Sequence, residues 1–485
     1  MRTYKKDITK EKENGRIYTP VYMVDNILDL SSYYGHGIIK KHVIDNSCGD
    51  GAFLCQVVKR YCEAALSQNF STDEIKKDLE KYIHGIEIDE TEQKKCIVNV
   101  TQEALRYGIH DVKWDIVCGD ALEIDRYNGK MDFVVGNPPY VRIHNLSEEI
   151  NDIKEFAFAQ GGMVDLFIVF YEIGLKMLSP KGVLGYITPS SFFNSLAGKI
   201  MRRTFCEQRL LDKVVDLKHY QAFSATAYTA IVILRRDKVD DTMDYYQFDE
   251  RNQIPYYVDR LTVSDYCIGE NFYFAEKGEL STLKKIYGNI GKSDILVKNG
   301  YATLCDDVFV HEFSFESEYI IPVIKSSKGI QQKIFYPYTS QGKLVPEEEL
   351  KRDEKMYQYL IKNKEKLLKR SNEKDSDRYW YSFGRSQAIN DTYRDKLAIN
   401  ALIRDEKDLK FVEAPAGVGV YGGLYIVSDS ISAEDISDAM KSEEFASYVT
   451  SLGKYKSGGY YTYSSKDVKL FLDYKFAYDG GLFQC

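Results

Sequence analysis

A regular alternation of short apolar segments and helical patterns over residues 41–236 constrains the fold of this chain more than any other feature. Its first cycle is an apolar strand pattern at 41–45, the turn NSCGDGAF and a helical pattern at 53–66. Strands that alternate with helices predict an α/β domain with a mostly parallel sheet and helices on both faces. We expect further strands at 82–89, 111–120, 130–136, 182–189, 211–218 and 227–236, the last two as an antiparallel pair, and helices from the second strand to about Tyr107 and at 165–178.

Polar residues follow the strands at the edge of the sheet where ligands bind in such folds. The first strand ends in Asp45-x-x-x-Gly49-x-Gly51, and its glycines allow a tight turn and a close backbone approach to a ligand. Glu87 ends the second strand and can accept from both hydroxyls of a ribose, while Asp120 follows the third and can accept from an adenine amino group. One acid alone is more simply a helix cap, but acids in this succession predict a site for an adenosine that carries an amino-acid tail.

The fourth strand, MDFVVG, runs into the sequence NPPY at 137–140. Its two prolines fix φ at about −65° and remove two backbone donors. The corner is therefore rich in acceptors, the Asn137 side-chain oxygen and the Pro138 carbonyl, beside the aromatic face of Tyr140. Two acceptors and a flat ring suit a planar group with an exocyclic NH2. A purely structural turn remains the alternative, since Asn-Pro commonly opens one.

Composition limits the class of protein. A length of 485 residues suggests two domains. No apolar run approaches about 18 residues and the charged N-terminus lacks a signal-peptide core, so we expect no membrane span and a cytoplasmic protein. The nine cysteines show no C-x-x-C spacing and the seven histidines do not cluster, which predicts neither a metal site nor a disulfide framework. The net charge of −8 means that nucleic-acid binding would need a local basic surface.

The order of these motifs resembles a known family. D-x-x-x-G-x-G, GIEID, CGDAL and NPPY, preceded by GRIYTP at 15–20, are similar to the S-adenosylmethionine-dependent amino-methyltransferases that act on DNA, in particular the gamma group of N6-adenine enzymes. The resemblance covers residues 15–236. It implies a charged arm at 1–14, a Rossmann-like catalytic domain that binds S-adenosylmethionine at 15–242, and a mixed α+β target-recognition domain at 243–485. It also implies a bacterial or phage-encoded enzyme.

Cytosine C5 methylation is not expected, because it needs a cysteine that usually follows a proline, and no cysteine here does.

The resemblance assigns roles to individual residues. The contacts of Asn46 and Ser47 stay open, since DNSCGDG departs from the family pattern. In catalysis, Asn137 and Pro138 would accept from the target amino group, and Tyr140 and Phe223 would sandwich a flipped-out base. In cofactor binding, Thr19, Asp45, Ser47 and Gly49 would face the methionine moiety, Glu87 the ribose, and Ile88, Asp120, Ala121, Pro139 and Phe170 (with Phe167 as the alternative to Phe170) the remainder of the cofactor.

The region beyond residue 240 has a different character. The stretch 351–370 has eight Lys or Arg against three Asp or Glu and predicts a basic helical face, with a merely solvated face as an equal alternative. RYWYSFGRSQAIN at 378–390 and KYKSGGYYTYSSKDVK at 454–469 interleave aromatic, amide and basic residues, a mixture typical of nucleic-acid contact. The expected partner is double-stranded DNA.

Other readings remain open at this point. Protein-glutamine methyltransferases also use NPPY, although their extra domain usually lies at the N-terminus. A methyltransferase that acts on RNA or on cytosine N4, and a non-catalytic DNA-specificity subunit, are further alternatives. No nuclease domain fits in the short N-terminal arm, so we expect modification without cleavage, with a separate cognate restriction endonuclease left open.

Overall fold

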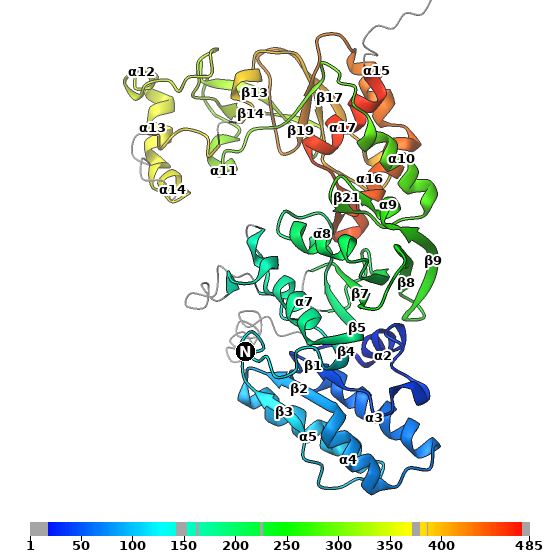
Figure 1. Cartoon of the computed structure of the whole chain (residues 1–485). Helices are drawn as coiled ribbons and strands as arrows, with labels where there is room; N and C mark the ends of the chain where they lie inside the picture. Colours follow the sequence, from blue (N-terminus) through cyan, green and yellow to red (C-terminus); the bar gives the residue numbers. More distant parts are fainter. Residues whose placement is uncertain are drawn as a thin grey trace, which may run out of the picture. The chain divides into compact units, whose positions relative to one another are not determined.

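The computed structural model describes residues 18–141, 153–161, 164–223, 227–370, 379–385 and 387–477 (Figure 1). The chain divides into two compact units, Met1–Ser281 and Thr282–Cys485. The division thus falls later than the expected boundary at 242/243. The reason is that strands β8 (Thr242–Asp249) and β9 (Ile254–Thr262) continue the sheet of the first unit, where β8 pairs in parallel with β6 and β9 pairs antiparallel with β8.

One nine-stranded sheet runs through the first unit in the order β3-β2-β1-β4-β5-β7-β6-β8-β9. Neighbouring strands from β3 to β5 are parallel, and β7 lies antiparallel between β5 and β6. This confirms the expected mostly parallel sheet and the antiparallel final pair. The strands are β1 (Val43–Asp45), β2 (Ile83–Glu87), β3 (Asp115–Cys118), β4 (Met131–Gly136), β5 (Leu178–Pro189), β6 (Leu211–Asp216) and β7 (Thr229–Arg235).

The strand order fixes where a ligand can bind. β1 pairs with β2 on one side and with β4 on the other, so the chain runs outward from β1 to β2 and β3 and then crosses back to β4 on the opposite side of β1. A crevice forms at such a switch point, outside the carboxyl ends of the strands. The segments that follow β1, β2, β3 and β4 all reach this edge.

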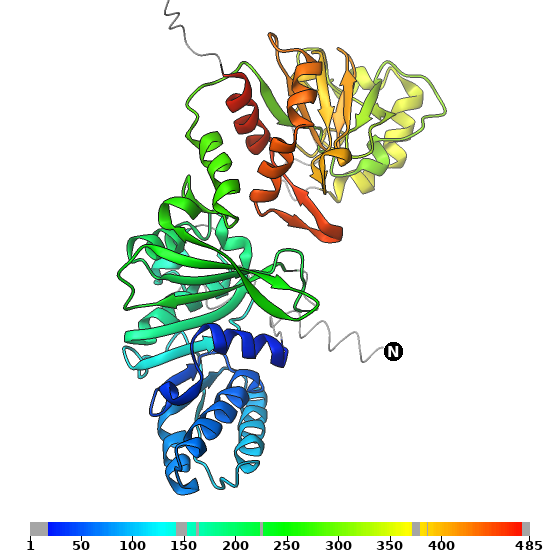
Figure 2. The ribbon, with the colours of Figure 1, turned by 90° about the vertical axis from the view of Figure 1, so that its right-hand side faces the viewer.

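Helices cover both faces of this sheet (Figure 1, Figure 2). Alternate side chains of a strand point to opposite faces, and β5 shows this directly. Val183 and Ile187 lie on one face and belong to the core cluster that also contains residues of α2, α3 and α5. Leu184 lies on the other face, against α7, where its side chain is only 2.5 Å from the position of a Cβ on Gly174. Among the described residues, no helix is long and apolar enough to cross a membrane. The helices are α2 (Val21–Leu30), α3 (Ala52–Ser67), α4 (Thr72–Tyr82), α5 (Glu90–Leu105), α7 (Leu166–Met177) and α8 (Lys199–Glu207).

In its described part, the second unit mixes helices with three small sheets, in the orders β12-β19-β15-β17, β14-β13-β18 and β16-β21-β20. The mixed α+β character expected for this region is therefore confirmed. The stretch 351–370 is not one helix, because the chain leaves helical geometry at Asn363 (φ −102°, ψ 3°). The helices of the stretch are α13 (Glu354–Lys362) and α14 (Lys364–Leu368), preceded by α12 (Glu347–Leu350). The strands of the three sheets are β12 (Leu296–Asn299), β13 (Ile320–Lys325), β14 (Ile330–Phe335), β15 (Lys396–Ile399), β16 (Leu402–Ile403), β17 (Phe411–Ala414), β18 (Gly419–Tyr421), β19 (Leu424–Val427), β20 (Tyr455–Lys456) and β21 (Tyr460–Thr462).

The glycine at the start of α3 gives a test of this fold. Gly51 has φ +94°, and a Cβ there would lie 2.9 Å from Cys96 Sγ. Gly108 has φ +72° and open space around it. A left-handed backbone costs a non-glycine residue about 1–2 kcal/mol, and overpacking adds to this cost only at Gly51. Gly51→Ala should therefore lower the free energy of unfolding in urea by more than Gly108→Ala does. Equal losses would contradict the close contact with Cys96.

Candidate functional site

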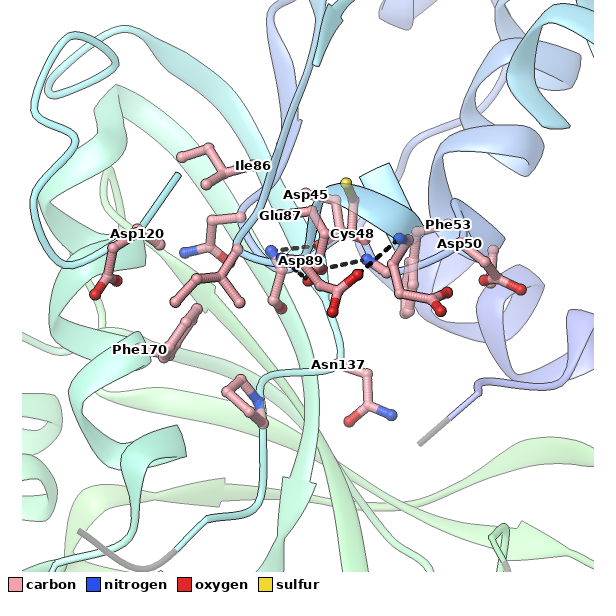
Figure 3. A pocket seen from close by; sticks show the side chains of 18 of the residues that line it. Asp45, Cys48, Asp50, Phe53, Ile86, Glu87, Asp89, Asp120, Asn137 and Phe170 are labelled. Carbon is pink, nitrogen blue, oxygen red and sulfur yellow. Dashed lines mark hydrogen bonds between the residues drawn. The ribbon is translucent and has the colours of Figure 1, made fainter. Parts of the chain in front are cut away.

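A cavity of about 480 Å³ lies at the carboxyl ends of β1 to β4 (Figure 3). Its walls come from the residues before α2, the turn after β1, the segments after β2 and β3, the NPPY corner and α7. This one cavity is lined by all the residues that were expected from the sequence to bind the cofactor, and by Asn137. They are Thr19, Asp45, Ser47, Gly49, Glu87, Ile88, Asp120, Ala121, Pro139 and Phe170.

The Glu87 carboxylate is held by two backbone amides. The Gly49 N–H donates to Oε2 at 2.8 Å, and the Asp89 N–H donates to Oε1 at 3.0 Å. These hydrogen bonds, drawn as dashed lines in Figure 3, fix the plane of the carboxylate. Each carboxylate oxygen has a further lone pair, so Glu87 can accept from two more donors in the cavity.

Asp89, two residues after Glu87, has a structural role at the start of α5. Its Oδ1 accepts from the N–H groups of Thr91 and Glu92, at 2.8 and 3.1 Å. Asp89 is therefore the N-cap of α5, a position at which an aspartate typically stabilises a helix by about 1 kcal/mol. Glu87 is left as the better oriented of the two acceptors after β2.

Asp45 is an acid buried at the floor of the cavity. Asp45 is only 1% exposed, and its Oδ1 accepts from the Ser47 N–H at 3.0 Å. Burial raises the pKa of Asp45 to about 8; the Ser47 hydrogen bond opposes this rise, and the charges of Glu87 and Asp50 add to it. A Cβ on Gly136 would lie 2.7 Å from Oδ1, so the end of β4 approaches the carboxyl more closely than any other residue type would allow.

The cavity is strongly acidic. Besides Asp45, Glu87 and Asp120, which the sequence singled out, Asp50 and Glu92 also line it. Lys95 pairs with Glu92 at 2.9 Å and offsets part of this charge. In the part of the chain that the structure describes, no group of three or more His, Cys, Asp or Glu side chains is placed to hold a metal ion. The surplus of carboxylates favours a guest with positive charge.

The structure distinguishes the two phenylalanines of α7. Phe170 lines the cavity, as Figure 3 shows. Phe167 is fully buried, and its ring packs against those of Tyr140 and Phe192, with centroids 6.3 and 6.4 Å away. Phe53, the second residue of α3, also lines the cavity. It was not among the residues expected from the sequence, although its place directly after the glycine turn was a usable signal.

The NPPY corner meets the residues before α2. Asn137 Nδ2 donates to Thr19 Oγ1 at 3.1 Å, and Thr19 is 8% exposed. The amide nitrogen thus faces Thr19 and the amide oxygen faces away from it. Of the GRIYTP motif, residues 15–17 lie outside the described residues.

Tyr140 and Phe223 contact each other edge to face, with ring centroids 6.4 Å apart and planes at 72°. The Tyr140 hydroxyl donates to the Ile187 carbonyl oxygen at 3.2 Å, and Phe223 belongs to the main core cluster. A base stacked between two rings needs them parallel and separated. The expected sandwich therefore requires at least one ring to rotate; residues 224–226, next to Phe223, lie outside the described residues.

Residues 28–223, which contain this cavity, match the family model of the Eco57I restriction-modification methylases. Over these 196 of its 485 residues, the chain is similar to the Eco57I family. Its first unit is accordingly a methyltransferase of the restriction-modification type, and the family implies S-adenosylmethionine as the methyl donor.

Individual relatives of this chain are distant. The type II methyltransferase M.BstVI of Geobacillus stearothermophilus is 24% identical over 76% of this chain and 74% of its own length. The type II restriction enzyme and methyltransferase RM.Eco57I of Escherichia coli is also 24% identical, over 80% of this chain but only 49% of its own length. The solved type IIL restriction-modification enzyme MmeI, in complex with DNA, is 14% identical with a TM-score of 0.62, and the match covers 91% of this chain and 63% of MmeI. MmeI thus shares the fold.

The buried acid predicts an unusual pH dependence of stability. The folded-state pKa of Asp45, about 8, exceeds its ordinary value of 3.8, so between these values the folded protein holds a proton that the unfolded chain has lost. The contribution of Asp45 to the unfolding free energy therefore falls as pH rises through this range. Asp45→Asn does not titrate, and its Oδ1 can still accept from Ser47. Without added cofactor, the variant should gain stability relative to the wild type between pH 5 and pH 8 in urea titrations. A difference that is the same at both pH values would refute this assignment.

Proposed function

We propose that this chain is a site-specific DNA methyltransferase that transfers the methyl group of S-adenosylmethionine to the N6 amino group of adenine. The observation that carries the proposal is the position of Asn137. This residue of NPPY lies in the same cavity as Glu87 and Asp120, so an amide that can accept from an amino group lies beside the two acids that we assign to a nucleoside.

The cavity suits this cofactor in volume and chemistry. Its volume of about 480 Å³ lies in the range of small-molecule sites. In Figure 3, Asp120 and Phe170 lie on one side of Glu87, and Asp50 and Phe53 lie on the other. We assign the adenine to the side of Asp120 and Phe170, the ribose to Glu87, and the methionine moiety to the turn after β1 with Asp45, Ser47 and Gly49, next to Thr19. Ile88 and Ala121 would flank the adenine, and Pro139 would close the cavity beside it.

When bound, S-adenosylmethionine supplies a methyl group activated by positive sulfur. The residues of the chain must then orient a weak nucleophile, because the lone pair of an adenine amino nitrogen is delocalised into the ring. Asn137 Oδ1 and the Pro138 carbonyl accept from its two N–H groups and favour a geometry with the lone pair free to attack. The cofactor would supply its methyl group to this nitrogen and keep the carbon–sulfur electron pair on its sulfur, and the amino proton would pass to solvent. Positioning and electrostatics supply the catalysis, without a strong base.

Tyr140 and Phe223 would stack on the extruded base and offset part of the cost of unpairing it. Both rings also pack in the core, so their removal lowers stability as well. Loss of a buried phenylalanine side chain typically costs about 3–5 kcal/mol. A stacking role for Phe223 is therefore tested by activity relative to folded fraction, with Phe223→Leu in place of Phe223→Ala.

Asn137→Ala tests the central assignment. The variant should lose methyl transfer by several orders of magnitude while its affinity for S-adenosylmethionine, measured by calorimetry, stays close to that of the wild type. Asn128→Ala is the matched control, because Asn128 is exposed in the turn before β4 and does not line the cavity. Mass spectrometry of nucleosides from digested product DNA should find N6-methyladenine.

The outcomes separate the alternatives. N4-methylcytosine would overturn the choice of base and leave the role of Asn137 intact. Label transferred to RNA or to protein glutamine in place of DNA would overturn the substrate. Near-normal turnover of Asn137→Ala would overturn the mechanism itself.

We further propose that the second unit contacts DNA through part of the stretch 351–370. Not all of its cations are available. Arg370 donates to the carbonyl oxygens of Thr303, Trp380 and Ser382, and Lys366 pairs with Asp307. Lys351 pairs with Glu348. By contrast, Lys355, Lys362 and Lys369 are exposed and form no ion pair with any residue that the structure describes.

The triple variant Lys355→Ala, Lys362→Ala, Lys369→Ala should weaken DNA binding and reduce the slope of log K against log salt by about 3, since each neutralised phosphate contributes about 0.9. A control triple variant with the same charge change, Lys77→Ala, Lys113→Ala, Lys181→Ala, removes lysines of the first unit that lie away from the cavity. Fluorescence-anisotropy titrations at several salt concentrations measure both slopes. If the two triple variants have the same slope, 351–370 does not bind the backbone of DNA.

A further inference from the structure

The hydrogen bond between Thr19 and Asn137 connects the segment before α2 with the NPPY corner after β4. We infer that the Thr19 hydroxyl is a positioning group: it accepts from the Asn137 amide and donates its own proton into the cofactor cavity, so that cofactor occupancy holds the amide oxygen of Asn137 toward the target amino group. This inference rests on the proposed function and adds a coupling that the function alone does not require.

Thr19 is well placed for such a role because its backbone is anchored. The next residue, Pro20, precedes α2, and its carbonyl oxygen accepts from the N–H groups of Met23 and Val24 at 2.9 and 3.1 Å. α2 itself packs into the main core through Met23, Val24, Ile27 and Leu28. A hydroxyl carried by this segment keeps its position relative to the end of β4, where Asn137 lies.

The side-chain amide of asparagine needs such a partner. A rotation of 180° about its last bond exchanges oxygen for nitrogen with almost no change of shape, and converts an acceptor into a donor. In the wrong orientation, the Asn137 NH2 would face the target NH2, and two donors would meet. The transfer requires the orientation in which nitrogen faces Thr19, which is the one in the structure, at 3.1 Å.

A hydroxyl alone does not settle the orientation, because it can accept from the amide nitrogen or donate to the amide oxygen. What settles it is the use of the single hydroxyl proton. Thr19 lines the cofactor cavity, and no acceptor in the described ranges takes its proton. A cofactor carboxylate that accepts this proton leaves the hydroxyl only its acceptor role toward Asn137. The orientation of the catalytic amide then depends on cofactor occupancy.

Two variants of Thr19 test the inference. Thr19→Val keeps the shape and removes the hydroxyl, whereas Thr19→Ser keeps the hydroxyl. With unmethylated plasmid DNA and saturating S-adenosylmethionine, Thr19→Val should lower kcat by about tenfold, the effect of losing one hydrogen bond worth about 1.4 kcal/mol, and Thr19→Ser should retain most of it. In an Asn137→Ala background, Thr19→Val should cause no further loss of single-turnover rate, because Thr19 acts through Asn137.

A binding measurement gives a readout that is independent of turnover. The demethylated product S-adenosylhomocysteine has the same carboxylate as the cofactor, so it should tighten the binding of plasmid-derived DNA fragments to the wild type and to Thr19→Ser. Thr19→Val should lose this tightening, because the coupling between the two ligands runs through the hydroxyl. Calorimetry on the protein alone gives the affinity for S-adenosylhomocysteine that each variant retains.

Three results would overturn the inference: an unchanged kcat of Thr19→Val at saturating cofactor, additive losses in the double variant, or intact coupling between S-adenosylhomocysteine and DNA. The first would reduce Thr19 to a cofactor contact. Unfolding midpoints identify a folding defect in Thr19→Val, in which case the smaller Thr19→Ala replaces it. A wild type that methylates RNA or protein in place of DNA would refute the proposed function, and the same variants would then test the coupling on that substrate.

Discussion

The carboxylate of Glu87 is the interaction on which the rest of the site depends. It accepts from Gly49 and Asp89 and so ties the turn after β1 to the segment after β2. Backbone hydrogen bonds strengthen the same junction, since the Cys48 N–H donates to the Ile86 carbonyl and the Gly119 N–H to the Glu87 carbonyl, each at 2.9 Å. Three strand ends are thereby held as one rigid edge. A cofactor that binds across them meets groups already in position and loses little free energy in ordering them.

This edge lowers the stability of the first unit for the sake of binding. Asp45 is buried without a cationic partner among the groups that set its pKa, and its neighbours Glu87 and Asp50 raise that pKa further. A buried carboxyl that must ionise for a cationic guest is unfavourable until the guest arrives. The close approach of Gly136 to Asp45 Oδ1 shows that the backbone is shaped around this group. Binding a positively charged cofactor should therefore stabilise the unit by more than its contact area suggests.

Much of the first unit was predictable because its signals are local. Apolar runs bounded by glycine and acidic residues gave β1, β2, β4 and β7, and the acids at the strand ends gave Asp45, Glu87 and Asp120 as cavity residues. The helix α4 was missed, since only Ile75, Leu79 and Tyr82 are buried in an otherwise charged segment. Asp50 and Phe53 were missed although they lie in and directly after the glycine turn, and Glu92 was missed because it reaches the cavity only through the packing of α5. The boundary was expected at 242/243 because β8 and β9 are rich in tyrosines and charged residues, like the region that follows them. Their pairing with the sheet of the first unit, which extends that unit to Ser281, is visible only in the fold.

The second unit shows where composition misleads. The stretch 351–370 has the charge of a DNA-binding face, yet Arg370 is turned inward to four carbonyl oxygens, and Lys366 is paired with an acid distant in sequence. Sequence can count cations, but only a fold shows which of them remain available to phosphates. The same distinction governs the NPPY corner. Its motif supplies an amide, but an amide is a dependable acceptor only when another group holds its nitrogen. Here that group is Thr19, 118 residues earlier in the chain, which no spacing within NPPY could have indicated.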